Sequence, residues 1–322
     1  MPCDLDQLRR IKQYFGKTIA QQPTHPLAKQ LQYENREYLA GFEAILAKLE
    51  STAGFKAIIR DCNKNSAGFY NNVTTLQFCE LLKESEYSVD QLFANKGDLL
   101  GGRIPDIKFR KSGSVAYAEC KHSLSQDQAK EILFEDFEDF SSMFNVWVSL
   151  TSPVYTTGIR KLAIEIQNRI RSKEKNGDIT EEKGEINNLG KYQLYPKEVM
   201  KRKRVILDFG WRGSETGQKI RDYMDDAKLK FARLCGEFNY LFIKSDDSAL
   251  QSHAISNLLC GSDGMFHDRA YGNIDSVVFV DWKNDVYEYQ NPSVNRKKII
   301  GELFHLRTPF PLSEEWLKKE GF

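Results

Sequence analysis

The sequence lacks the features of a membrane or secreted protein. Its 322 residues contain no apolar run of the roughly 18 residues that a membrane-spanning helix needs. The first residues, MPCDLDQLRR, carry acids and bases where a signal peptide would have an apolar segment. We therefore expect a soluble, cytoplasmic protein with no membrane partner.

Several families of hydrolase motif are also missing. The six cysteines are dispersed, without a CxxC pair or a suitably spaced histidine to complete a zinc site. There is no GxSxG, no HExxH and no phosphate-binding loop. A serine hydrolase, a zinc hydrolase and an ATPase therefore have no supporting motif, and the cysteines are expected to be reduced.

The sequence has almost no excess of charge of either sign. Its 46 basic and 45 acidic residues give a net charge of +1, and 41% of its residues are hydrophobic. This composition is typical of a globular protein with material for one large domain or two ordinary ones. A polyanionic partner would have to be held by a local patch, because the whole-protein field is close to neutral.

Hydrophobic periodicity predicts an α/β protein. Helices are expected over 4–15 and 26–50, which form a helical N-terminal extension covering 1–54, and residues 55–62, FKAIIRDC, are expected to form a strand. Residues 72–151 are expected to run helix, three strands, helix, strand, and 152–322 to continue with alternating helices and strands, apart from a polar surface excursion after residue 173. Such alternation is typical of a mixed sheet with helices on both faces.

The segment RIPDIKFRKSGSVAYAECKH, residues 103–122, is the most informative one. Its two apolar arms, separated by RKSG, indicate a β-hairpin. Because side chains alternate along a strand, Glu119 and Lys121 are expected on one face and Cys120 on the other. Strand pairing can then bring Asp106 beside Glu119. The hairpin would thus gather two carboxylates and one ammonium group.

This combination of groups fits metal-assisted hydrolysis of a phosphodiester. Two carboxylates are ligands that suit Mg²⁺ or Mn²⁺, with water in the remaining positions. A neighbouring lysine can neutralise charge that develops in the transition state. The plain alternative is a solvated hairpin that carries surface charges.

The pair Pro105-Asp106 followed by Glu119-Cys120-Lys121 resembles the signature of the PD-(D/E)XK nucleases, the restriction-endonuclease-like family. The resemblance implies a domain over 55–322 with a mixed-sheet core at about 72–151, flanked by helices, and a C-terminal elaboration over 152–322. It implies that Asp106, Glu119 and the backbone carbonyl of Cys120 bind the metal and that Lys121 is catalytic. In this family a residue of the first helix often assists the metal, and Gln77 and Glu80 are both candidates.

A basic run precedes the expected strand RVILDFGW. It could contact a phosphate backbone, or it could be an ordinary solvated charge run. Its members are Lys201, Arg202, Lys203 and Arg204.

The expected function is therefore a Mg²⁺-dependent nuclease, most simply a DNA endonuclease that acts on double-stranded DNA in restriction or defence. A homodimer is plausible because cutting two strands with one site per chain often requires two copies. The alternative is a catalytically inactive module of the same fold that binds nucleic acid or a protein. The sequence leaves open DNA or RNA, and internal or terminal cleavage.

Overall fold

The protein is a mixed α/β protein with two compact units. The structure, a computed structural model, describes residues 8–93, 104–111, 113–138, 143–150, 156–186, 189–197, 205–209, 216–232, 234, 238–246, 250–281 and 283–294. The first unit comprises Met1–His122 and Ile220–Phe322, and the second comprises Ser123–Lys219. The second unit is therefore inserted in the sequence of the first.

The first unit begins with helices, as the sequence predicts. They are α1 (Arg9–Gln21), α2 (Pro26–Gln32), α3 (Arg36–Leu49), α4 (Phe55–Cys62) and α5 (Ser66–Glu84). The expected single helix over 26–50 is two helices, because Glu34 has a positive φ of 52°. Asn35 then caps α3 by accepting a hydrogen bond from the amide of Tyr38 at 3.2 Å.

Helix α4 corrects the strand that was expected over residues 55–62. Phe55, Ile58, Ile59 and Cys62 are all buried. Their spacing of three, four and seven positions after Phe55 places them on one face of a helix. The short segment is compatible with a strand by composition, but its apolar residues follow the helical period.

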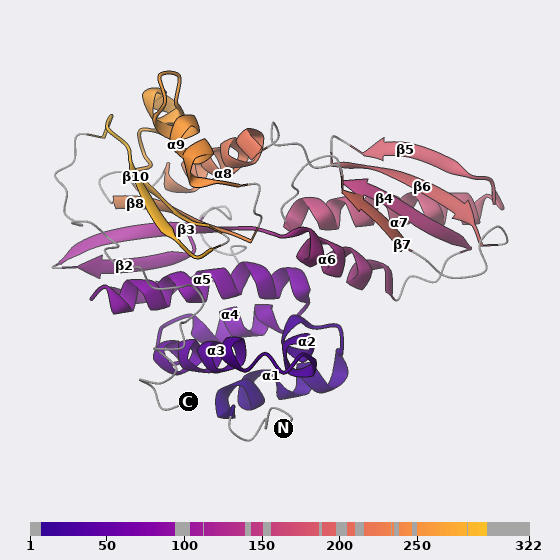
Figure 1. The fold of residues 1–322 in the computed structure, drawn as a ribbon, viewed down its shortest axis with the longest axis horizontal. Helices are drawn as coiled ribbons and strands as arrows, with labels where there is room; N and C mark the ends of the chain where they lie inside the picture. Colours follow the sequence, from indigo (N-terminus) through magenta and orange to yellow (C-terminus); the bar gives the residue numbers. More distant parts are fainter. Residues whose placement is uncertain are drawn as a thin grey trace. The chain divides into compact units, whose positions relative to one another are not determined.

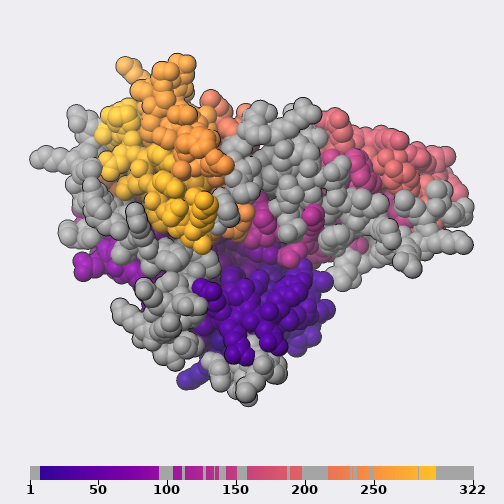
Figure 2. All heavy atoms as spheres, in the orientation of Figure 1, coloured from indigo at the N-terminus to yellow at the C-terminus, as the bar shows by residue number. Residues whose placement is uncertain are grey.

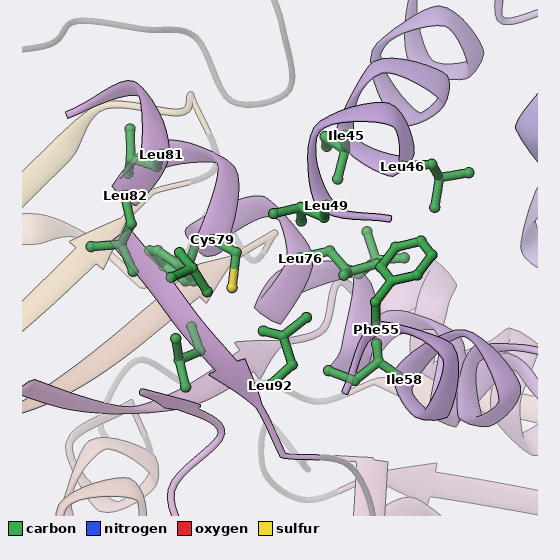
Figure 3. Packing of buried hydrophobic residues seen from close by; sticks show 14 of the residues in the cluster. Ile45, Leu46, Leu49, Phe55, Ile58, Leu76, Cys79, Leu81, Leu82 and Leu92 are labelled. Atoms are coloured by element: carbon green, nitrogen blue, oxygen red, sulfur yellow. The ribbon is translucent and has the colours of Figure 1, made fainter. Parts of the chain in front are cut away.

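The helices of the first unit share one hydrophobic core with its sheet. Leu49 of α3, Phe55 of α4, Leu76 of α5 and Leu92 of the first strand belong to one buried cluster, and Figure 3 shows them converging. Burial of each such side chain stabilises the fold by roughly 1.5–3 kcal/mol. The first 54 residues are thus packed into the core of the first unit.

Gly54 lies where the helices approach the edge of the sheet. Its φ is +86°, and a Cβ atom there would lie 1.8 Å from the carbonyl oxygen of Leu92. Next to it, the amide of Leu92 donates to the carbonyl oxygen of Ala53 at 2.8 Å. Only glycine allows this close approach of the two backbones.

A six-stranded sheet forms the centre of the first unit. Its strands, in spatial order, are β1 (Ser88–Leu92), β2 (Ile107–Lys111), β3 (Ser114–Ser123), β8 (Phe238–Ser245), β9 (Ser276–Val280) and β10 (Val286–Gln290). Strands β1, β2 and β3 form an antiparallel meander, β8 and β9 are parallel, and β10 is antiparallel to β9. The sheet is therefore mixed, as expected.

Helices cover both faces of this sheet. Helix α5 packs on one face, against Ala116, Ala118 and Phe242 among others. The other face is covered by α8 (Thr216–Phe231) and α9 (Ser252–Cys260), which share a second cluster with Leu241 and Ile243. Figure 1 shows α5 and the α8–α9 pair on opposite sides of the strands. Two short 3₁₀ helices, Met265–His267 and Arg269–Tyr271, follow α9.

The surface of the first unit includes both ends of its described sequence. In the space-filling view, the N-terminal helices form an indigo region and the segment from α9 to β10 an orange-to-yellow one (Figure 2). Both regions are exposed on the face that is drawn.

The strand beside β3 differs from the one that the sequence suggests. The expected order of helix, three strands, helix, strand over 72–151 does occur along the chain, as α5, β1, β2, β3, α6 and β4. Strand β4, however, belongs to a second sheet, and β8 is the neighbour of β3. In the first unit, the helix and strand that follow β3 are therefore α8 and β8.

The second unit has its own four-stranded sheet. The elements, in chain order, are α6 (Gln126–Glu138), β4 (Phe144–Leu150), α7 (Thr156–Lys175), β5 (Glu182–Ile186), β6 (Gly190–Pro196) and β7 (Val205–Phe209). The sheet has the order β5-β6-β4-β7, with β7 parallel to β4 and the other pairs antiparallel. The polar stretch that was expected as a surface excursion contributes the edge strand β5, in which Lys183 and Glu185 are exposed.

The helices of the described part of the chain include none with the length and hydrophobicity of a transmembrane span.

Candidate functional site

The β2–β3 hairpin brings Asp106 beside Glu119. The two strands pair with Ile107 opposite Ala118, so Asp106 and Glu119 occupy the next two opposite positions of the hairpin. The amide of Asp106 donates to the carbonyl oxygen of Ala118 at 2.8 Å. The Oδ2 atom of Asp106 accepts a hydrogen bond from the amide of Cys120 at 2.7 Å. The predicted hairpin is therefore confirmed, and it fixes the Asp106 carboxylate at the start of β2.

Glu119 and Lys121 share the face of β3 that is covered by α8 and α9. Tyr117, two positions earlier on the same face, packs against the α8–α9 cluster, whereas Cys120 packs against the cluster of α5. The Nζ atom of Lys121 lies 2.8 Å from Oε1 of Glu119. Glu119 is only 1% exposed, so this carboxylate is buried. The alternation predicted from the sequence is thus present.

Helix α8 adds two charged groups that the sequence analysis did not select. The ammonium of Lys230 forms an ion pair with Oε1 of Glu119 and lies 3.0 Å from Oδ2 of Asp226. The same Oδ2 atom accepts a hydrogen bond from Lys121. Glu119, Lys121, Asp226 and Lys230 therefore form a closed ring of alternating charges. The available signal was the spacing of four between Asp226 and Lys230, which places both on one side of a helix.

The contacts within the ring favour the charged forms of Lys121 and Asp226. Burial by itself would lower the pKa of the Lys121 ammonium, but Glu119, Asp226 and Asp106 outweigh it and hold that pKa above its ordinary value. Burial would likewise raise the pKa of the Asp226 carboxyl. Lys121 and Lys230 outweigh this effect and keep the pKa of Asp226 below its ordinary value.

Gln77 and Glu80 lie on α5, which packs on the opposite face of the sheet from Glu119 and Lys121. Both are buried, with exposures of 6% and 3%. Oε1 of Glu80 accepts a hydrogen bond from Lys48 at 2.9 Å. The fold thus brings Asp106, Glu119 and Lys121 together on the β2–β3 hairpin. Gln77 and Glu80 belong to the helix that covers the other face of the sheet.

Two further parts of the expected site stay predictions. The backbone carbonyl of Cys120 lies between the two charged residues of β3 in the sequence, and its role as a metal ligand stays an expectation. The basic run that was expected to contact nucleic acid lies outside the described residues. Its members are Lys201, Arg202, Lys203 and Arg204.

A second polar cluster lies at the end of β3. The Nε2 atom of His122 is 2.8 Å from Oδ2 of Asp246, and Nδ1 is 3.2 Å from the carbonyl oxygen of Tyr70. Lys244 donates to Oδ1 of Asp246 at 2.8 Å. Burial would raise the pKa of the Asp246 carboxyl, but His122 and Lys244 outweigh it and hold that pKa well below its ordinary value. This cluster ties β3 to β8 and to α5.

The donor set at Asp106 and Glu119 fits a magnesium-type ion better than a zinc-type ion. Within the described part of the chain, no group of three or more His, Cys, Asp and Glu residues is arranged to hold a metal. Zinc sites generally need three or four such ligands, whereas Mg²⁺ is commonly bound by one or two carboxylates and several waters. Asp106 and Glu119 supply two carboxylates. Lys121 and Lys230, however, already contact Oε1 of Glu119.

Comparisons of the chain with protein-family models, with curated proteins and with solved structures found no match.

Proposed function

We propose that this protein is a Mg²⁺- or Mn²⁺-dependent nuclease that hydrolyses phosphodiester bonds, with Asp106, Glu119 and Lys121 at its centre. The observation that carries the proposal is the β2–β3 hairpin, whose pairing gathers these three side chains. Two carboxylates can hold a metal ion that assists phosphodiester hydrolysis, and a neighbouring lysine can stabilise the charge that develops on the phosphate.

The order of elements in the first unit supports the resemblance to the PD-(D/E)XK nucleases. The family's core runs helix, three strands, helix, strand. In the six-stranded sheet of this protein, α5 is followed by β1, β2 and β3, and then by α8 and β8. The inserted second unit separates β3 from α8 in the sequence. The motif residues lie on the second and third strands of this series.

Each side chain has a role in the proposed reaction. Asp106 and Glu119, with the carbonyl of Cys120, would hold the metal ion. When bound, such an ion polarises a phosphoryl oxygen and lowers the pKa of bound water. The ammonium of Lys121 stays charged because neighbouring carboxylates raise its pKa. Lys121 would therefore stabilise the negative charge that develops on the phosphate as water adds to phosphorus and the P–O bond to the leaving oxygen breaks.

Double-stranded DNA in the cytoplasm is the proposed substrate, and restriction or defence against foreign DNA is the proposed setting. A homodimer would supply one site for each strand. The test is incubation of plasmid and linear DNA with Mg²⁺ or Mn²⁺, and with EDTA as the metal-free reference. Cleavage is expected in wild type. Asp106→Ala and Lys121→Ala should each lower the rate by at least about 100-fold, the loss typical of one transition-state contact.

Lys56→Ala and Asp263→Asn are matched controls, because Lys56 and Asp263 are exposed and belong to α4 and to the loop after α9. Both should cleave like wild type. Equal cleavage by Asp106→Ala, Lys121→Ala and the controls would contradict the proposed site.

A second candidate function is a module of the same fold that binds nucleic acid or a protein without cleavage. The observation in its favour is the closed ring at Glu119, whose buried carboxylate is already contacted by two ammonium groups. Gel-shift binding of DNA in EDTA, together with no cleavage in either metal, would favour this candidate over the nuclease.

A further inference from the structure

The contacts of Lys230 indicate a part in metal binding that the hairpin motif does not include. Glu119 is 1% exposed, and its Oε1 atom is contacted by both Lys121 and Lys230. A divalent cation that binds Glu119 through Oε1 would have to displace an ammonium group from this oxygen. Lys121 and Lys230 carry the two ammonium groups that the metal ion could displace from Glu119.

Lys121 belongs to the same strand as Glu119. It lies two positions further along β3, so both side chains leave the same face of one strand. Strand geometry keeps them neighbours. Lys230 instead reaches Glu119 from α8, and its position depends on a long side chain from another element.

Asp226 is a second acceptor for Lys230, as it is for Lys121. The Nζ atom of Lys230 lies 3.0 Å from Oδ2 of Asp226, one helical turn earlier on α8. The Asp226 side chain is 46% exposed, whereas that of Lys230 is 9% exposed. The ammonium group can thus leave Glu119 in the direction of solvent and keep an anionic partner.

The formal charges of the site favour a metal ion that replaces the Lys230 ammonium over one that binds beside it. Asp106, Glu119 and Asp226 carry three negative charges, and Lys121 and Lys230 carry two positive ones. A divalent ion that entered with Lys230 in place would meet two ammonium groups at one carboxylate oxygen. Like charges at such short range oppose binding strongly in a site with little solvent.

We infer that Lys230 is a tethered counter-ion that competes with the divalent metal for Glu119, so that metal binding is linked to transfer of the Lys230 ammonium to Asp226. This inference rests on the proposed function, because it requires a metal at Glu119. In the metal-free protein Lys230 neutralises the buried carboxylate. Its displacement lowers the apparent metal affinity of the site.

Binding of Mn²⁺ to the full chain, without DNA, tests the inference. The free Mn²⁺ signal in electron paramagnetic resonance gives the dissociation constant directly. Lys230→Met should bind Mn²⁺ at least about tenfold more tightly than wild type, because the competing charge is gone. Lys230→Arg, which keeps the charge, should bind like wild type or more weakly. Glu119→Gln should abolish binding in both the wild-type and the Lys230→Met background.

Mn²⁺ binding by Asp226 variants gives a second test. It distinguishes transfer of the Lys230 ammonium to Asp226 from a general electrostatic effect of the Asp226 charge. Asp226→Asn removes the alternative acceptor, so it should weaken Mn²⁺ binding in wild type. In the Lys230→Met background this weakening should largely disappear, since no ammonium remains to be transferred. If Asp226 acted only through its negative charge, the same weakening would occur in both backgrounds, which would overturn the linked transfer.

The outcomes separate the inference from the proposed function. Binding that depends on Glu119 but is equally tight in wild type and Lys230→Met would overturn the inference alone. No Mn²⁺ binding by either protein would overturn the proposed metal site, and the inference with it. Circular dichroism checks that each variant is folded, and Lys230→Gln replaces Lys230→Met if the latter does not fold.

Discussion

Glu119 on β3 and Lys230 on α8 form a buried ion pair between residues that are 111 positions apart in the chain. The pair joins the hairpin that carries the motif to a helix that follows the inserted second unit. Its partners Lys121 and Asp226 close the ring on the same face of the sheet. The candidate site therefore also contributes to the packing of α8 on the sheet.

Replacement of Glu119 by glutamine should destabilise the first unit. The change leaves the ammonium groups of Lys121 and Lys230, which are 18% and 9% exposed, with Asp226 as the remaining carboxylate of the ring. Loss of one partner of a buried pair costs about 3–5 kcal/mol, and we expect about 3 kcal/mol because Asp226 still accepts. Urea unfolding followed by circular dichroism measures this loss. The exposed Asp263→Asn control should change stability by less than about 0.5 kcal/mol.

Asp246 should make the stability of the first unit depend on pH in the acid range. His122 and Lys244 hold its pKa below the ordinary value in the folded state, so the unfolded chain binds the proton more readily. The stabilisation is therefore complete above the unfolded pKa and is lost as the pH falls toward the folded pKa. Asp246→Asn should lower stability at pH 7 by about 2 kcal/mol and flatten its decline between about pH 5 and pH 2.

Urea unfolding at a series of pH values measures this dependence. If the acid decline of Asp246→Asn were as steep as that of wild type, the contacts of Asp246 with His122 and Lys244 would not be the source of the pH dependence.

Asp136 should make the stability of the second unit depend on pH in the opposite direction. Burial raises its pKa to about 6, Arg160 opposes that shift and Glu135 adds to it. Because the folded state holds the proton more tightly, the stability of the second unit should fall by up to about 3 kcal/mol as the pH rises from the unfolded pKa through about 6. Carbon-13 NMR of the side-chain carboxyl should give a midpoint near 6.

Asp178 provides the contrast in the same experiment. Hydrogen bonds from Lys173 and Thr180 hold the pKa of Asp178 well below its ordinary value. The two carboxyls should therefore titrate in clearly separate ranges, and coincident midpoints would contradict the environment described for Asp136.

Gly54 should tolerate no side chain. Gly54→Ala combines a positive φ with a Cβ atom 1.8 Å from the carbonyl oxygen of Leu92, so the helix–sheet contact must shift. We expect a loss of at least about 2 kcal/mol in the free energy of unfolding. Gly16→Ala is the matched control, because Gly16 lies inside α1 and its nearest neighbour would be 3.9 Å away. That change should instead stabilise the protein by about 0.5–1 kcal/mol. Comparable losses in both variants would show that backbone approach at Gly54 is not the cause.

Local sequence patterns determined the hairpin and the direction of its side chains. The RKSG turn and the two apolar arms predict β2 and β3, and strand alternation predicts that Glu119 and Lys121 share a face, as the structure has them. These features depend on neighbours within about twenty residues, so they can be read from the chain directly. Where the segment was short, as in α4, composition predicted a strand and only the period of buried residues distinguished a helix.

Tertiary structure alone decided what completes the site. The sequence places α6 and β4 directly after β3, yet β4 pairs in the second sheet, and β8 lies beside β3. Asp226 and Lys230 contact residues that are 105 and 111 positions earlier. No local period encodes such pairings, because they depend on which hydrophobic faces of the first unit pack together, and the inserted second unit separates these segments in the sequence. The local sequence thus determines the hairpin motif, whereas tertiary packing determines that Asp226 and Lys230 lie beside it.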